Sequence, residues 1–167
     1  CDTARRLVVK TDLQGKVIWE KGAPPEPGVY NDKTPYIPTN LTFAPHNGDF
    51  YVADGYGSSY IHQYDFRGNW IRTFGGPGTE PGKFQTPHGI FMDRRGKEPF
   101  LVVMDRSNHR LQFLTLEGKH VRTVTEGMRR PCYADRRGPE ILLPDLDSVV
   151  TILDEKDRVV ASLGDGH

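Results

Sequence analysis

Three side chains in the sequence have the chemistry of a metal-assisted acid–base site. His88 lies in the segment TPHG (86–89), Tyr56 in DGY (54–56), and Arg106 directly after Asp105. A neutral imidazole is a good zinc ligand, a phenol can transfer a proton, and a guanidinium supplies a fixed positive charge. Simpler interpretations stay open. Tyr56 and Arg106 also suit a turn-capping role. His88 alone does not make a zinc site, because such a site needs three or four ligands.

Four other histidines fit ordinary structural positions. His46 falls in a turn, His62 and His120 fall on outer strands, and His109 falls in another turn. Polar residues are expected at such places, so we predict no chemical role for them.

An internal repeat positions these residues. Its copies begin at Asp2, Asp54, Asp105 and Asp145, which are 52, 51 and 40 residues apart. Each aspartate is followed by a turn, an alternating strand, a hairpin and a last strand. Two further strands precede the aspartate in the later copies. Four short antiparallel strands per repeat are typical of a β-propeller blade, whereas an all-β sandwich would not repeat this order in register.

We therefore predict an all-β chain, a β-propeller with about three and a half four-stranded blades, and its repeats resemble those of the NHL type. The expected parts are a half blade at 1–22 and blades at 38–75, 87–127 and 131–164. Propellers typically need four to eight blades to close, so we expect an arc cut from a larger ring, with an arc that stands open as the alternative.

The register of the repeat also predicts individual strands. In one blade they are 87–92, 100–104, 110–115 and 120–125, with 87–92 innermost. The innermost strands of its neighbours are expected at 40–44 and 132–134. Innermost strands line the central channel, so His88, Tyr56 and Arg106 should face one cavity at the channel mouth. The apolar residues expected to pack between blades are Trp70, Phe74, Phe91, Val103, Phe113 and Ile152.

Composition limits the function. Lysine plus arginine total 22 and aspartate plus glutamate total 22, so the formal net charge is zero. This balance argues against a nucleic-acid partner, because such surfaces carry a basic excess. No apolar run approaches the roughly 18 residues that span a bilayer, so we expect no membrane partner. Two cysteines do not make a disulfide framework.

Four segments together resemble the peptidyl-α-hydroxyglycine α-amidating lyases, a family of six-bladed propellers. They are PTN (38–40), DGY (54–56), FQTPHG (84–89) and DRSN (105–108), and the resemblance is clear over residues 1–127. The family splits a carbinolamide C–N bond, which gives a peptide amide and glyoxylate. It holds zinc on the channel axis and a structural calcium deeper inside.

The resemblance implies roles for three residues. His88 matches one of three zinc-ligand histidines, Tyr56 the general base, and Arg106 an arginine that orients the substrate. The other zinc histidines and the calcium ligands are expected outside this chain. The resemblance also implies a small peptide-like substrate and an extracellular or periplasmic location.

The alternative to an enzyme is a non-catalytic NHL-repeat scaffold that binds a protein, peptide or glycan. Two departures from the family keep it open, since Gly57 stands where the family has a cysteine and Asn40 where it has an aspartate. Self-association of two chains to complete the ring is a further expectation.

Overall fold

The computed structural model describes residues 1–166. Within these residues it contains β-strands and a single three-residue 3₁₀ helix, η1 (Arg106–Asn108), and no helix that is long and apolar enough to cross a membrane. The strands of the first half are β1 (Val8–Thr11), β2 (Val17–Lys21), β3 (Asn40–Phe43), β4 (Phe50–Ala53), β5 (Tyr60–Tyr64) and β6 (Trp70–Gly75). Those of the second half are β7 (Pro87–Asp93), β8 (Phe100–Asp105), β9 (Arg110–Leu114), β10 (His120–Val124), β11 (Asp135–Arg137), β12 (Glu140–Pro144), β13 (Val150–Leu153) and β14 (Val159–Leu163).

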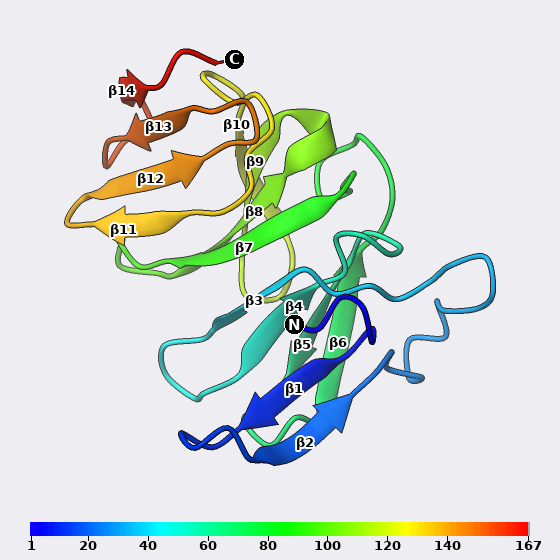
Figure 1. Cartoon of the computed structure of the whole chain (residues 1–167). Helices are drawn as coiled ribbons and strands as arrows, with labels where there is room; N and C mark the ends of the chain where they lie inside the picture. Colours follow the sequence, from blue (N-terminus) through cyan, green and yellow to red (C-terminus); the bar gives the residue numbers. More distant parts are fainter. Residues whose placement is uncertain (167) are drawn as a thin grey trace.

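The strands form one two-stranded and three four-stranded antiparallel sheets, each in sequence order. The sheets follow one another as an arc from the N-terminus to the C-terminus (Figure 1). The four strands predicted between residues 87 and 125 are confirmed as one sheet, because β7, β8, β9 and β10 pair in that order. The first strand of one blade packs on the next, with β3 lying against β7. The chain is therefore an arc of a β-propeller of about three and a half blades.

One hydrogen-bond pattern recurs in the hairpin turn of each copy of the repeat. A side-chain oxygen at the start of the turn accepts the backbone N–H groups two and four residues later. Asp65 accepts from Arg67 at 2.9 Å and Asn69 at 2.8 Å. The equivalent residues are Asp12, Thr115 and Asp154. This bond pattern closes the turn between the third and fourth strands of every blade.

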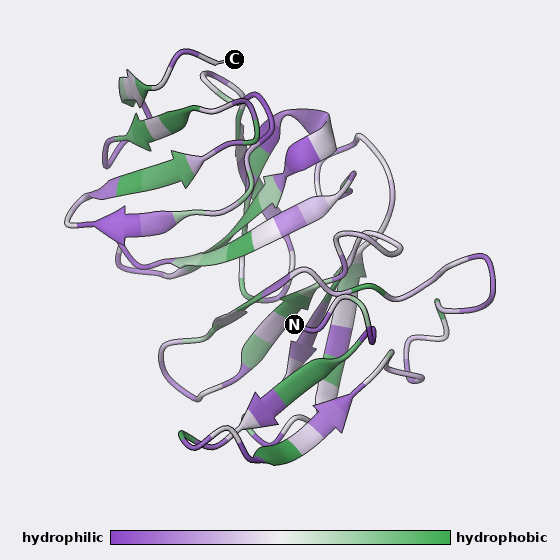
Figure 2. Cartoon of the chain, viewed as in Figure 1, coloured by the Kyte–Doolittle hydropathy of each residue, from purple (hydrophilic) through white to green (hydrophobic). Residues whose placement is uncertain are grey.

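The innermost strand of the last blade was predicted in the wrong place. The apolar segment 132–134 is not a strand, and β11 covers Asp135–Arg137 instead. In Figure 2 β11 is largely hydrophilic, whereas its partner β12 is hydrophobic. The two-residue connection between Arg137 and Glu140, with Gly138 at φ 60°, fixes the register so that Asp135 faces Leu142. Turn geometry, rather than hydrophobicity, decides where this strand lies.

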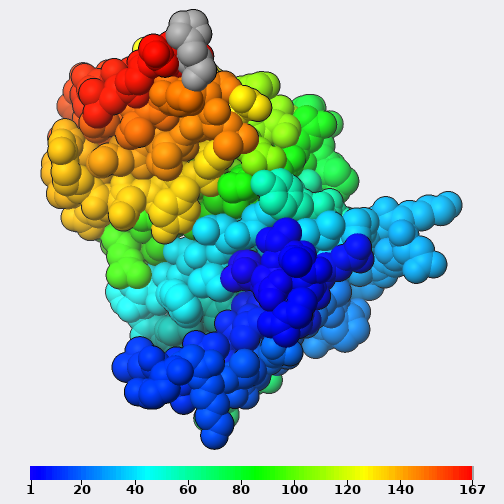
Figure 3. Space-filling model, in the orientation of Figure 1, coloured from blue at the N-terminus to red at the C-terminus, as the bar shows by residue number. Residues whose placement is uncertain are grey.

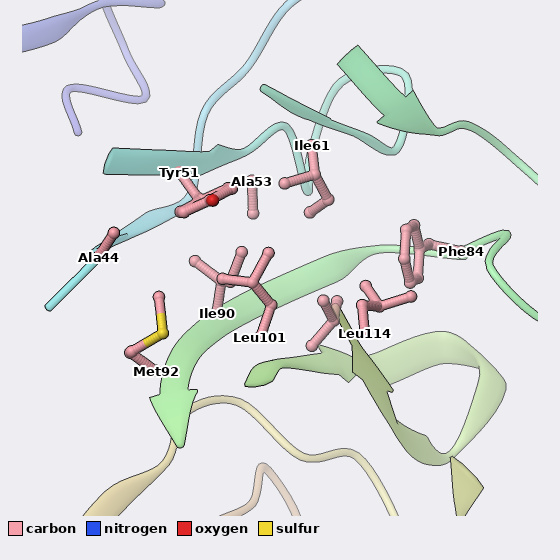
Figure 4. Packing of buried hydrophobic residues seen from close by; sticks show 10 residues of the cluster. Ala44, Tyr51, Ala53, Ile61, Phe84, Ile90, Met92, Leu101 and Leu114 are labelled. Carbon is pink, nitrogen blue, oxygen red and sulfur yellow. The ribbon is translucent and has the colours of Figure 1, made fainter. Parts of the chain in front are cut away.

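Apolar side chains fill the spaces between neighbouring sheets. One cluster joins the second and third sheets, with Tyr51 and Ile61 facing Ile90 and Leu101 (Figure 4). Of the residues predicted to pack between blades, Val103 belongs to this cluster and Phe113 to the next, with Phe74, Phe91 and Trp70 packed at cluster margins. Ile152 is buried but lies outside the three clusters.

The long connection 22–38 leaves the first sheet and returns to start the second. It protrudes from one side of the molecule, in light blue in Figure 3. Its last residues nevertheless bond to the second sheet, as Ile37 donates to the Asp54 carboxylate at 2.6 Å. The connection therefore reaches the turn that carries Tyr56.

Candidate functional site

His88, Tyr56 and Arg106 come together at one end of the sheets. The Tyr56 hydroxyl lies 3.1 Å from Nε2 of His88, with the two rings edge to face at 5.4 Å between centroids. Arg106 donates to the Tyr56 oxygen at 3.3 Å, and its guanidinium carbon lies 5.2 Å from the centre of the Tyr56 ring. Because Tyr56 is 47% exposed, the group faces solvent at its outer side.

The position of His88 depends on an irregularity in β7. Pro87 pairs with Asp105 and Gly89 with Met104, so His88 is an extra residue opposite β8. Such bulges redirect a side chain and are common beside functional sites. Gly89 is required next to it, because a Cβ there would lie 2.4 Å from the Cys132 carbonyl oxygen.

The protonation state of His88 follows from its hydrogen bonds. Nδ1 lies 3.0 Å from the Cys132 carbonyl oxygen, which can only accept, so Nδ1 carries the hydrogen. Nε2 is left with its lone pair, and the Tyr56 hydroxyl donates to it. Burial lowers the pKa of His88 and the positive charge of Arg106 lowers it further, against the opposing effect of the Cys132 carbonyl. A neutral imidazole with a fixed tautomer is the form that binds a metal.

Tyr56 lies in the turn between β4 and β5. Its N–H donates to the Ile37 carbonyl at 3.2 Å, which ties the turn to the connection 22–38. Gly55 is required because a Cβ there would lie 2.4 Å from the Pro87 carbonyl oxygen. The turn that carries Tyr56 is therefore held between the connection 22–38 and the next blade.

Arg106 begins η1, in the equivalent turn of the next blade. The two turns match, since Asp105 accepts the Gln85 N–H just as Asp54 accepts that of Ile37. Arg106 is the first residue after its aspartate, whereas Tyr56 is the second, and this offset lets the guanidinium reach over the Tyr56 ring.

Cys132 was not expected at the site. It follows Pro131 at the start of the last blade, as His88 follows Pro87, and this repeated pattern is the signal that could have revealed it. Burial raises the pKa of the Cys132 thiol, while Arg106 opposes this increase. Within residues 1–166, no group of three or more His, Cys, Asp or Glu side chains is placed to hold a metal. His88 fits a metal ligand by its tautomer, but further ligands would have to come from elsewhere.

His62 lies on β5, as predicted, but the sequence did not indicate its burial. It is fully buried, and burial lowers its pKa to about 3. Its ring touches the Tyr30 hydroxyl, which in turn donates to the Asp54 carboxylate at 3.0 Å. The sequence pattern placed His62 on a strand but could not show that the connection 22–38 would cover it.

Comparisons with known proteins support the fold. No known protein-family profile matches the sequence. Among curated proteins, the chain is 36% identical over 93 residues to peptidyl-glycine alpha-amidating monooxygenase B of Xenopus laevis. This match covers 52% of this chain and 10% of that protein. The chain is also 30% identical over 125 residues to peptidylglycine alpha-amidating monooxygenase of Rattus norvegicus. That match covers 71% of this chain and 12% of the rat protein. The chain thus spans about a tenth of the length of these relatives.

A solved structure has the same arrangement over nearly the whole chain. It is a catalytically inactive virginiamycin B lyase from Staphylococcus aureus with quinupristin. The TM-score is 0.68 at 14% identity, over 96% of this chain and 49% of that one. At this identity the similarity shows the propeller fold alone.

Proposed function

We propose that this chain is part of an NHL-type propeller that acts as a peptidyl-α-hydroxyglycine α-amidating lyase. The contact among Tyr56, His88 and Arg106 is the observation that carries the proposal, since it joins an acid–base group, a metal-competent imidazole and a cation from neighbouring blades. The identities of 36% and 30% to two amidating monooxygenases support it.

The side chains suit the required proton transfer. The substrate is a carbinolamide with a hydroxyl, an amide nitrogen and a carboxylate on one carbon. In this step Tyr56 would act as a phenolate beside the Arg106 cation. It would take the substrate hydroxyl proton as the C–N bond breaks and the carbon–oxygen bond becomes a carbonyl, and it would pass that proton to the leaving nitrogen. The products are a peptide amide and glyoxylate. Arg106 would hold the substrate carboxylate beside Tyr56, because a guanidinium binds carboxylates well.

His88 would hold zinc through Nε2, in place of the hydrogen bond that it accepts there from Tyr56, with Nδ1 fixed by the Cys132 carbonyl. Bound zinc would polarise the substrate oxygen as a Lewis acid. We propose that the remaining zinc ligands and the calcium ligands lie outside residues 1–166. The same proposal includes an extracellular or periplasmic location.

The test is turnover of a peptidyl-α-hydroxyglycine substrate by protein expressed from its complete gene. Tyr56→Phe should lower kcat by about 10²–10⁴. Arg106→Lys should raise KM, whereas Arg67→Lys is a matched control, since Arg67 also stacks on an aromatic ring at 5.0 Å but lies in a distant turn. Absence of turnover in the parent protein, or full kcat in Tyr56→Phe, would refute the lyase proposal.

One observation favours the scaffold alternative. An apolar groove of about 340 Å³ lies between the first two sheets and is lined by Val8, Trp19, Leu41, Phe43, Phe50 and Phe66. Phe43 and Phe66 are exposed. A propeller that failed the turnover test would be expected to bind a protein or peptide through such a surface.

A further inference from the structure

A chain of hydrogen bonds runs through the second blade and ends at the turn that carries Tyr56. Trp70 Nε1 donates to Thr73 Oγ1 at 2.9 Å, and Thr73 Oγ1 lies 2.8 Å from His62 Nδ1. His62 Nε2 contacts the Tyr30 hydroxyl, which lies 3.0 Å from Asp54 Oδ2. The chain thus links β6, β5 and the connection 22–38 to Asp54.

The two ends of this hydrogen-bond chain decide which partner donates in each of its hydrogen bonds. The Trp70 indole can only donate, and an ionised Asp54 can only accept. With Asp54 ionised, Tyr30 donates to Asp54 and His62 Nε2–H donates to Tyr30. The Thr73 hydroxyl then donates to His62 Nδ1, so every link is satisfied by a neutral His62 with its hydrogen on Nε2.

Protonation of Asp54 reverses three of these links. The neutral carboxyl donates to the Tyr30 oxygen, because its other neighbours, the N–H groups of Ile37 and Ser58, are donors. Tyr30 then donates to His62 Nε2, and His62 must carry its hydrogen on Nδ1 and donate to Thr73. Thr73 is only half-buried, so its own hydroxyl hydrogen can turn to solvent.

Within residues 1–166 Asp54 forms no ion pair, whereas the equivalent Asp2 and Asp105 each pair with an arginine. In the next blade Asp105 pairs with Arg110 at 2.7 Å and accepts from Gln112 at 3.0 Å. The register of the ladders places Tyr60 and His62 in β5 where Arg110 and Gln112 stand in β9.

The titratable groups that face Asp54 are aromatic. They are Tyr30 and Tyr36 from the connection 22–38 and His62 and Tyr64 from β5. Nearby charges lie at the margins, with Arg6 beside Tyr30 and Tyr36 and Glu26 beside Tyr64. In this apolar surrounding, burial raises the pKa of Asp54 to about 6, although the N–H groups of Ile37 and Ser58 and the Tyr30 hydroxyl oppose the increase.

Asp54 also holds the Tyr56 turn in place. Its carboxylate accepts the N–H groups of Ile37 at 2.6 Å and Ser58 at 2.7 Å. Ile37 in turn accepts the Tyr56 N–H, and Ser58 follows Tyr56 by two residues. We infer that Asp54, Tyr30 and His62 form a reversible hydrogen-bond chain, in which the protonation of Asp54 sets the tautomer of His62 and makes Asp54 a positioning residue for Tyr56. The effect of Asp54 on catalysis by Tyr56 rests on the proposed function, whereas the hydrogen-bond chain does not.

The test is the ¹⁵N NMR signature of the His62 ring, followed from pH 4.5 to pH 8 in ¹⁵N-histidine-labelled protein. We expect the Nε2–H tautomer above pH 6 and the Nδ1–H tautomer below it, with His62 neutral in both. Asp54→Asn, which removes the titrating carboxyl, should hold a single His62 tautomer throughout. Tyr30→Phe should abolish the pH response, and Tyr60→Phe, which removes a neighbouring hydroxyl outside the chain, should retain it.

One His62 tautomer at every pH in the parent protein would overturn the inference, and so would a pH response that survives in Tyr30→Phe. This readout needs no turnover. A switching tautomer in a protein without lyase activity therefore refutes the proposed function and leaves the hydrogen-bond chain intact.

Discussion

The hydroxyl of Tyr56 lies 3.1 Å from Nε2 of His88, although the two residues belong to different blades. Two glycines make this contact possible, because Gly55 and Gly89 let the backbones of adjacent blades approach closely. The candidate site is thus a product of blade-to-blade packing, and several predictions about that packing can be measured.

The first prediction concerns Gly89. A Cβ at this position would lie 2.4 Å from the Cys132 carbonyl oxygen and 2.9 Å from the Met104 sulfur. Gly89→Ala should lower the free energy of unfolding by about 1–3 kcal/mol through overpacking. Gly96→Ala is the control, since the nearest atom would be 3.6 Å away. Urea unfolding measures both, and equal stability of the two variants would contradict the close approach.

Phe113 should be a main stabiliser of the packing between the last two sheets. It is fully buried, and the Arg122 guanidinium lies 3.6 Å from its ring centre. Phe113→Ala should cost about 3–5 kcal/mol in the free energy of unfolding. Phe66→Ala removes an exposed ring and should cost far less. If thermal unfolding shows Phe113→Ala to be as stable as the parent, this placement is wrong.

Arg95 joins the last two blades by buried ion pairs. It lies 2.9 Å from Asp93 and 2.6 Å from Asp157, and its side chain is 6% exposed. Arg95→Ala leaves both carboxylates buried without this partner, so it should cost about 3–5 kcal/mol. Arg137→Ala breaks an exposed pair with Glu140 and should cost less than about 1 kcal/mol. Similar urea midpoints for the two variants would argue against the buried network.

Asp54 should make stability depend on pH in an unusual direction. Its pKa is raised to about 6 in the folded protein, so the neutral form favours folding. Its contribution is fully present below pH 4 and is lost as the pH rises through 6. The destabilisation caused by Asp54→Asn should therefore be greater at pH 4 than at pH 7.5.

Asp65→Asn is the control with the opposite sign. Hydrogen bonds from Asn69 lower the pKa of Asp65, so its contribution is present above pH 4 and is lost as the pH falls below it. Urea unfolding at pH 3, 4, 6 and 7.5 measures both variants. The same pH trend for both would show that the environment of Asp54 is misassigned.

The sequence predicted the fold well because the repeat carries its own turn chemistry. Asp65 and its equivalents recur with glycine at the hairpins, so the strands between them could be located. Segment 132–134 was placed wrongly because its apolar residues resemble a strand, whereas the two-residue turn after Arg137 sets the register.

The site was predicted only in part. Tyr56, His88 and Arg106 could be found because they lie in turns and strand starts of the repeat. Tyr30 and His62 could not, because their contact depends on how the connection 22–38 folds back over β5, and that connection carries no repeat signal.

The zinc content of protein expressed from its complete gene, measured together with turnover of a peptidyl-α-hydroxyglycine substrate, tests the central claim most directly. We predict about one zinc per ring and measurable turnover, both lost in His88→Ala and both kept in His120→Ala, whose imidazole lies on β10 and bonds Thr123. A parent protein that holds no zinc, and whose turnover does not change in His88→Ala, would contradict the lyase account and favour the scaffold.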